Sequence, residues 1–136
     1  MQTVRPLSRE QMGFFDTFGS LAFPGLLADC IDEVIEAFEE VWQQHGRGHN
    51  GLPHDGSERS CIVPFPDQHP RLCELFDDPR IDAIASALMG DDYNLMPSDG
   101  NYYAGDTRWH SDGADTDILH VKFAYYLDPL TRGTGC

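Results

Sequence analysis

The sequence predicts an α+β domain in which helices come first and strands follow. The segment from Leu26 to His45 repeats its apolar residues with helical spacing, so they fall on one face. After residue 92, short runs of aromatic and branched residues are separated by Ser, Asp and Gly, which is typical of strands. This order favours helices packed against a mostly antiparallel sheet. The 136 residues suit a single domain, mainly helical over 1–92 and with its strands over 93–136.

The first helix is expected between residues that mark both of its ends. Ser8 lies three residues before Gln11, which is the pattern of a capping box, and Gly19 supplies a C-terminal stop. A short strand is expected next, over residues 20–23. The long amphipathic helix then begins at Leu26.

Residues 46–70 are expected to form one long loop, because Gly, Pro and His are frequent there. Loops of this length inside a compact domain are commonly lids or mobile segments. Two short helices are expected after the loop, over residues 70–78 and 79–90. Each begins at a proline, which suits the first turn of a helix.

Three strands are expected in the C-terminal part, over residues 93–97, 101–105 and 117–127. Side chains alternate between the two faces of a strand, so the last of these divides into an odd-numbered and an even-numbered face. His120 lies on the even-numbered face. The odd-numbered face is the more apolar and is expected to point into the domain: Leu119, Val121, Phe123, Tyr125 and Leu127.

The charge of the chain restricts its partners. The formal net charge is −14, and so acidic a surface repels nucleic acid and anionic membranes, so neither is expected as a partner. No apolar run approaches the roughly 20 residues that a membrane-spanning helix needs. The N-terminal residues lack the apolar core of a signal peptide, which predicts a cytoplasmic protein. The four cysteines show no CxxC spacing and are expected to be buried or free thiols.

The stretch RWHSDG carries the residues best suited to bind a metal, His110 and Asp112. In an extended segment these two side chains point to the same side. An imidazole and a carboxylate are ligands of the two-histidine, one-carboxylate triad that holds non-heme Fe(II). The H-x-D spacing is common by chance. Its position here, after an expected strand and before a glycine, strengthens the hypothesis of a metal site. A calcium loop counted from Asp112 is excluded, because its sixth and twelfth positions hold Asp117 and Phe123 rather than Gly and Glu.

Several segments taken together resemble the N-terminal half of the phytanoyl-CoA dioxygenase family. In order, they are similar to the family's opening helix and turn, its paired helices, its first metal-bearing strand and the long strand after it: FFDTFGSLAFPGLL, LCELFDDPRIDAIASALMGDD, NYYAGDTRWHSDG and HVKFAYYLDPLTRGTGC. Members of the family are Fe(II)- and 2-oxoglutarate-dependent oxygenases. The resemblance implies N-terminal helices packed on a double-stranded β-helix of the jelly-roll or cupin type, with the barrel incomplete in this chain.

The resemblance also implies roles for individual residues. His110 and Asp112 would be the first two iron ligands, and the third would be a histidine on a later strand that is not in this chain. Tyr125 matches an aromatic residue that lies against 2-oxoglutarate, while a tyrosine of the core is the structural alternative. Asn101 or Tyr103 would also contact this co-substrate. Related halogenases carry a small residue in place of the aspartate, so Asp112 favours hydroxylation.

Two functions remain open at this point. The first is a dioxygenase that uses Fe(II), 2-oxoglutarate and dioxygen to hydroxylate a small organic substrate. The second is a truncated, non-catalytic member of the family that acts only through self-association or a partner chain. Self-association would use an open edge of the sheet, because an unpaired apolar edge favours pairing with another strand.

Overall fold

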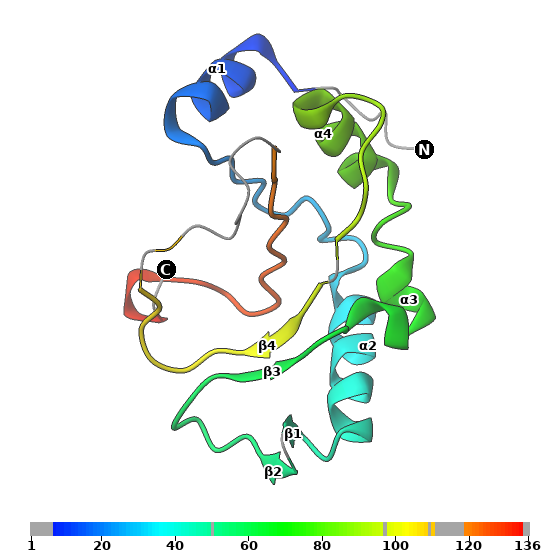
Figure 1. Cartoon of the computed structure of the whole chain (residues 1–136), viewed down its shortest axis with the longest axis vertical. Helices are drawn as coiled ribbons and strands as arrows, with labels where there is room; N and C mark the ends of the chain where they lie inside the picture. The colour runs from blue at the N-terminus through cyan, green and yellow to red at the C-terminus, as the bar shows by residue number, and fades with distance from the viewer. Residues whose placement is uncertain (1–6, 50, 97, 109, 111–118, 135–136) are drawn as a thin grey trace.

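The computed structural model describes residues 7–49, 51–96, 98–108, 110 and 119–134 (Figure 1). These residues form the following elements, in chain order: α1 (Arg9–Phe18), α2 (Ile31–Gln44), β1 (Gly48–His49), β2 (Leu52–Pro53), β3 (Ser60–Ile62), the 3₁₀ helix η1 (Pro66–Gln68), α3 (Pro70–Cys73), α4 (Pro79–Met89), β4 (Gly100–Tyr102) and the 3₁₀ helix η2 (Arg132–Thr134). The strands form two antiparallel pairs, β1 with β2 and β3 with β4. This combination of helices and small antiparallel sheets agrees with the predicted α+β class.

Helix α1 begins and ends where its sequence indicates. The Gln11 amide donates to the Ser8 hydroxyl at 3.2 Å, and the Ser8 amide donates to the Gln11 side chain at 2.9 Å. These two bonds complete the capping box. Gly19 ends the helix in the left-handed conformation, with a φ of 71°. The prediction for this element is therefore confirmed.

Helix α2 begins at Ile31, and the predicted start at Leu26 is wrong. The chain before Ile31 forms turns, in which amides bond to carbonyls three residues earlier. The cause is Arg80, whose Nη1 donates to the Leu26 carbonyl at 2.7 Å and to the Asp29 carboxylate at 2.6 Å. A side chain 54 residues away in sequence therefore holds this segment outside the helix.

The prediction of a single long loop over residues 46–70 is also wrong. The segment contains β1, β2, β3 and η1. Ser60 and Ile62 of β3 are buried, as is Phe65 just after them. Strand β3 forms because Ser60 pairs with Tyr102, a residue far along the chain that local composition does not reveal. Ser60, Ile62 and Phe65 thus belong to the core.

The two helices before β4 lie where they were predicted, and one of them is shorter than predicted. Helix α4 has Pro79 in its first turn and Gly90 at its end, and the Asp78 carboxylate accepts from the Arg80 amide at 2.8 Å as an N-cap. Helix α3 ends at Cys73 rather than at residue 78. No helix in the described ranges has the length and apolar content needed to cross a membrane.

The predictions of strands over residues 20–23 and 93–97 are wrong. Residues 20–23 and 93–96 lie in irregular structure, because a run with strand composition forms no ladder unless a second segment pairs with it. The strand expected over 101–105 is present only in part, as β4 (Gly100–Tyr102), and residues 103–105 lie outside it.

The last expected strand, over residues 117–127, forms no hydrogen-bonded ladder in its described part. Its burial nevertheless alternates with a period of two, as in an extended chain. The half-buried residues are odd-numbered and the residues between them are exposed, which agrees with the predicted inward face, except that Leu119 is exposed. None of the inward residues shares a backbone hydrogen bond with another described residue: Val121, Phe123, Tyr125 and Leu127.

The core lies between α2, α3 and the β3–β4 pair. Trp42 of α2 is fully buried, and its ring lies 4.5 Å from that of Tyr102 on β4. Burying one large apolar side chain contributes about 1.5–3 kcal/mol, so α2 is a main source of stability. Leu127 packs against the same core from the C-terminal segment. The buried cluster is Val34, Ala37, Val41, Trp42, Ile62, Phe65, Leu72 and Leu75.

Candidate functional site

His110 lies in the segment that follows β4, and its side chain is exposed. Its Nδ1 is 2.7 Å from the backbone carbonyl oxygen of Arg108. A carbonyl oxygen can only accept a hydrogen bond, so Nδ1 carries a proton and donates it. In the neutral imidazole the lone pair is then on Nε2. The local geometry therefore favours the tautomer in which Nε2 is the nitrogen able to bind a metal.

Asp112, the predicted second ligand, lies outside the described residues, so the geometry of the pair stays a prediction. Within the ranges that the structure describes, no group of three or more His, Cys, Asp and Glu side chains is arranged to hold a metal ion. Three other histidines make polar contacts elsewhere in the fold: His45 with Gln68, His54 with Ser60, and His69 with Glu40.

Asn101 and Tyr103, the two residues predicted to contact a co-substrate, lie beside Arg59 on one face of the β3–β4 pair. Arg59 Nε donates to Asn101 Oδ1 at 2.7 Å. The Arg59 guanidinium carbon lies over the Tyr103 ring, 5.0 Å from its centroid. The opposite face of the pair is the one that packs into the core, through the buried Ser60 and Ile62. The structure thus brings two predicted residues together on the half-exposed face.

Arg59 is a residue of this face that the sequence reasoning missed. Its Nη2 also donates to Asp99 Oδ2 at 2.8 Å and lies 3.5 Å from the Cys61 sulfur. Burial raises the pKa of the Cys61 thiol, which keeps it protonated and uncharged at neutral pH. The two-residue alternation of Asp99, Asn101 and Tyr103 was visible in the sequence. Its register with Arg59 was not, because that depends on the pairing of distant strands.

Tyr125 is half-buried in the C-terminal segment. Burial, together with the negative charge of Asp78, raises its pKa to about 12. Asp78 itself is paired with Arg80 at 2.7 Å, and this guanidinium lowers the pKa of the Asp78 carboxyl. The described surroundings of Tyr125 therefore include the start of α4, and its contact with 2-oxoglutarate stays a prediction.

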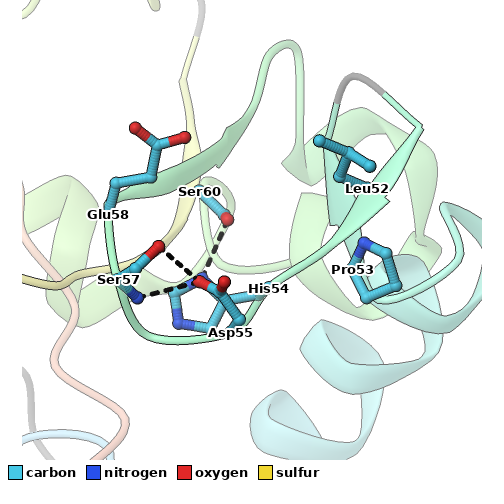
Figure 2. Close-up of a pocket in the computed structure, with 7 residues that line it drawn as sticks. All are labelled: Leu52, Pro53, His54, Asp55, Ser57, Glu58 and Ser60. Atoms are coloured by element: carbon cyan, nitrogen blue, oxygen red, sulfur yellow. Dashed lines mark hydrogen bonds between the residues drawn. The ribbon is translucent and has the colours of Figure 1, made fainter.

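A hollow of about 110 Å³ lies at β2 and the turn into β3, and it was not predicted (Figure 2). His54 Nδ1 is 2.8 Å from the Ser60 hydroxyl, and the Asp55 carboxylate accepts from both the amide and the hydroxyl of Ser57. Ser60 is only 3% exposed, so its contact with His54 satisfies a buried hydroxyl and presents no accessible nucleophile. The His54 ring also stacks on Tyr102, with 5.1 Å between centroids. These contacts give the hollow a structural role.

Comparison of the chain with protein-family models, with curated proteins and with solved structures finds no match. Any function for the chain must therefore be argued from its own residues. Two features of the described part are available for this purpose: the oriented imidazole of His110 and the Arg59 face of the β3–β4 pair.

Proposed function

We propose that this chain carries part of the iron site of a non-heme Fe(II)- and 2-oxoglutarate-dependent dioxygenase that hydroxylates a small organic substrate. The observation that carries the proposal is the hydrogen bond from His110 Nδ1 to the Arg108 carbonyl. Metal-ligating histidines almost always donate their other ring N–H to a carbonyl, a carboxylate or water, which fixes both tautomer and ring orientation. His110 meets this requirement within the H-x-D motif of the sequence.

The residue types of the proposed ligand set suit iron, and of this set the structure describes His110. His110 would bind through Nε2, and Asp112 would supply the carboxylate of a two-histidine, one-carboxylate site. The resemblance assigns the third ligand to a histidine on a later strand, and no histidine follows His120 in this sequence. When bound, iron with 2-oxoglutarate would supply the oxidation of an unactivated C–H bond by dioxygen, with release of succinate and carbon dioxide.

The remaining predicted residues would position the co-substrate and exclude water. Tyr125 has the inward orientation and half-buried position expected of a side chain that covers a ligand. Asn101 offers an amide that can hydrogen-bond a carboxylate or a carbonyl. The roles proposed here for both residues depend on the same iron site, so a result that refutes the site also refutes these roles.

The test is a calorimetric titration of Fe(II) into the whole chain without oxygen and with 2-oxoglutarate present. His110→Ala and Asp112→Asn should each weaken binding by about tenfold or more, because the first removes a direct ligand and the second removes the negative charge of another. His120→Ala and Asp106→Asn are matched controls, since both residues are exposed and neighbour the motif. Equal affinity in all four variants, or no binding by the unmodified chain, would refute the proposal.

A second candidate function is association with another copy of the chain through residues 119–130. Leu119, Tyr126 and Leu130 of this segment are large apolar residues that remain exposed. Among the described residues no strand pairs with the extended backbone beside them, and a backbone edge of this kind readily accepts another strand. Sedimentation over a wide concentration range tests this role, with Tyr126→Lys expected to reduce association. A mass that stays monomeric at every concentration would eliminate it.

A further inference from the structure

We propose that Arg59 forms a binding site for the carboxylate group of a small organic acid on the half-exposed face of the β3–β4 pair. The site consists of Arg59 with the three residues that hold it, Asp99, Asn101 and Tyr103. Carboxylates are a preferred partner of arginine, because the planar guanidinium presents its N–H groups in a fixed fork.

The guanidinium is held in place by contacts along one of its edges. Nε donates to Asn101 at 2.7 Å and Nη2 to Asp99 at 2.8 Å, while the Tyr103 ring lies under the plane of the group. Three contacts to alternate residues of one strand segment fix the orientation of a side chain that would otherwise be flexible. Because the fold already holds the guanidinium in one orientation, binding of a ligand would cost little additional side-chain entropy.

Among the described residues, the Nη1 end of the guanidinium remains available to a ligand. The contacts of Arg59 use Nε and Nη2, and its Nη1 has no hydrogen-bond partner among the described residues. The side chain is 42% exposed, so a small molecule can reach it from solvent.

Arg59 pairs with fewer carboxylates than Arg71 and Arg80 do. Arg71 is paired with two carboxylates, those of Glu33 and Glu74. Arg80 is likewise paired with Asp29 and Asp78. Arg59 faces a single carboxylate, and its other polar partners are a neutral amide and a thiol. The net charge of −14 opposes anion binding over most of the surface, so an anion needs a local cation such as the Arg59 guanidinium.

The charge balance indicates which anion fits. Asp99 already balances the charge of the guanidinium, so a ligand group with a single negative charge, such as a carboxylate, meets the least repulsion here. A phosphate monoester carries about −1.5 to −2 charges at neutral pH and would meet stronger repulsion from Asp99. The exposed Tyr103 next to Arg59 adds apolar surface that suits the carbon chain of an organic acid.

The carboxylate could belong to 2-oxoglutarate or to the substrate, and this choice is where the inference rests on the proposed function. Strand β4 leads directly into the segment that carries His110. The binding of an acid to Arg59, however, requires no metal. It can therefore be measured separately from the iron site.

The test is a calorimetric titration of the metal-free whole chain with 2-oxoglutarate and, separately, with hexanoate as a simple monocarboxylate. Arg59→Ala should weaken binding of the preferred acid by about tenfold or more, since a charge-assisted hydrogen bond is lost. Arg59→Lys should retain part of the affinity, because it keeps the charge without the fork. Asp99→Asn should bind the acid more tightly than the unmodified chain, since it removes the competing carboxylate. Arg9→Ala, on the exposed surface of α1, is the control.

The outcomes separate the two sources and the two proposals. Tighter binding of 2-oxoglutarate assigns the site to the co-substrate, and tighter binding of hexanoate assigns it to an acidic substrate. Binding that is absent, or equal in the Arg59 and Arg9 variants, overturns the inference, as does an Asp99→Asn variant weakened as much as Arg59→Ala. None of these results alters the Fe(II) titration of the His110 variants, so failure of one proposal is distinct from failure of the other.

Discussion

The ring of Phe65 lies so close to Gly100 that a β-carbon on this glycine would overlap it. Phe65 is buried in the core, and its amide donates to the Ser98 carbonyl at 3.1 Å. Gly100 is the first residue of β4, the strand that pairs with β3 and leads toward His110. The close approach of ring and backbone therefore fixes how the strand pair sits on the core.

Replacement of Gly100 by alanine should destabilise the protein. The added methyl group requires Phe65 or the strand to move, which costs about 1–3 kcal/mol of unfolding free energy. Gly13→Ala is the matched control, because Gly13 lies on the exposed surface of α1 and a methyl group there would meet no atom within 4 Å. That variant should gain about 0.5–1 kcal/mol from helix propensity. Chemical denaturation measures both changes, and equal stability of the two variants would contradict the packing described.

Replacement of Arg80 by leucine should destabilise the protein by about 2–4 kcal/mol at neutral pH. Asp78 and Arg80 are each only 15% exposed, so the change leaves a poorly solvated carboxylate without its partner. Arg71→Leu is the control, because its partners Glu33 and Glu74 are exposed, and it should cost about 0–1 kcal/mol. Thermal or urea unfolding would count against this account if the two variants were equally stable.

The loss in Arg80→Leu should also depend on pH. Arg80 lowers the pKa of Asp78 below its ordinary value of 3.8 in the folded protein. The ion pair therefore contributes fully above pH 3.8, and its contribution is lost as the pH falls through the lower folded pKa. The difference in unfolding free energy between the unmodified chain and Arg80→Leu should shrink in that acidic range. A difference that stays constant with pH would exclude the ion pair as its cause.

Tyr125 should make the fold sensitive to alkali. Its pKa rises from an ordinary value of 10.0 to about 12 because burial disfavours the charged form. Its contribution is therefore complete below pH 10 and is lost as the pH rises toward 12. Tyr125→Phe should unfold at higher pH than the unmodified chain, whereas Tyr126→Phe, which alters an exposed ring, should not. Identical alkaline transitions in both variants would show that Tyr125 is not shielded from solvent.

Sequence reasoning succeeded where the cause of a structure is local. Ser8 and Gln11 make their capping box within one helical turn, and Pro79 and Gly90 bound α4 in the same way. The alternation along the C-terminal segment was also predictable, because the inward position of Tyr125 follows from the two-residue period of an extended chain.

The predictions failed where the cause is distant in sequence. The start of α2 depends on Arg80 reaching the Leu26 carbonyl, and β3 depends on its pairing with β4. For the same reason the contact of Arg59 with Asn101 was not predicted, since the two residues are 42 positions apart. The tautomer of His110, set by a carbonyl two residues away, is local but has no signature in residue types.

The most direct test of the iron site is to observe the two ring nitrogens of His110 individually. Long-range proton–nitrogen NMR spectra of the chain with labelled histidine distinguish protonated from unprotonated and metal-bound ring nitrogens. Assignment is made with His110→Ala, and Zn(II) serves as a diamagnetic substitute for Fe(II). We predict that Nδ1 of His110 is protonated before and after Zn(II) is added, and that the Nε2 signal of His110 shifts on addition while those of His120 stay unchanged. A His110 protonated on Nε2, or a Zn(II) response confined to other histidines, would contradict the proposed metal site.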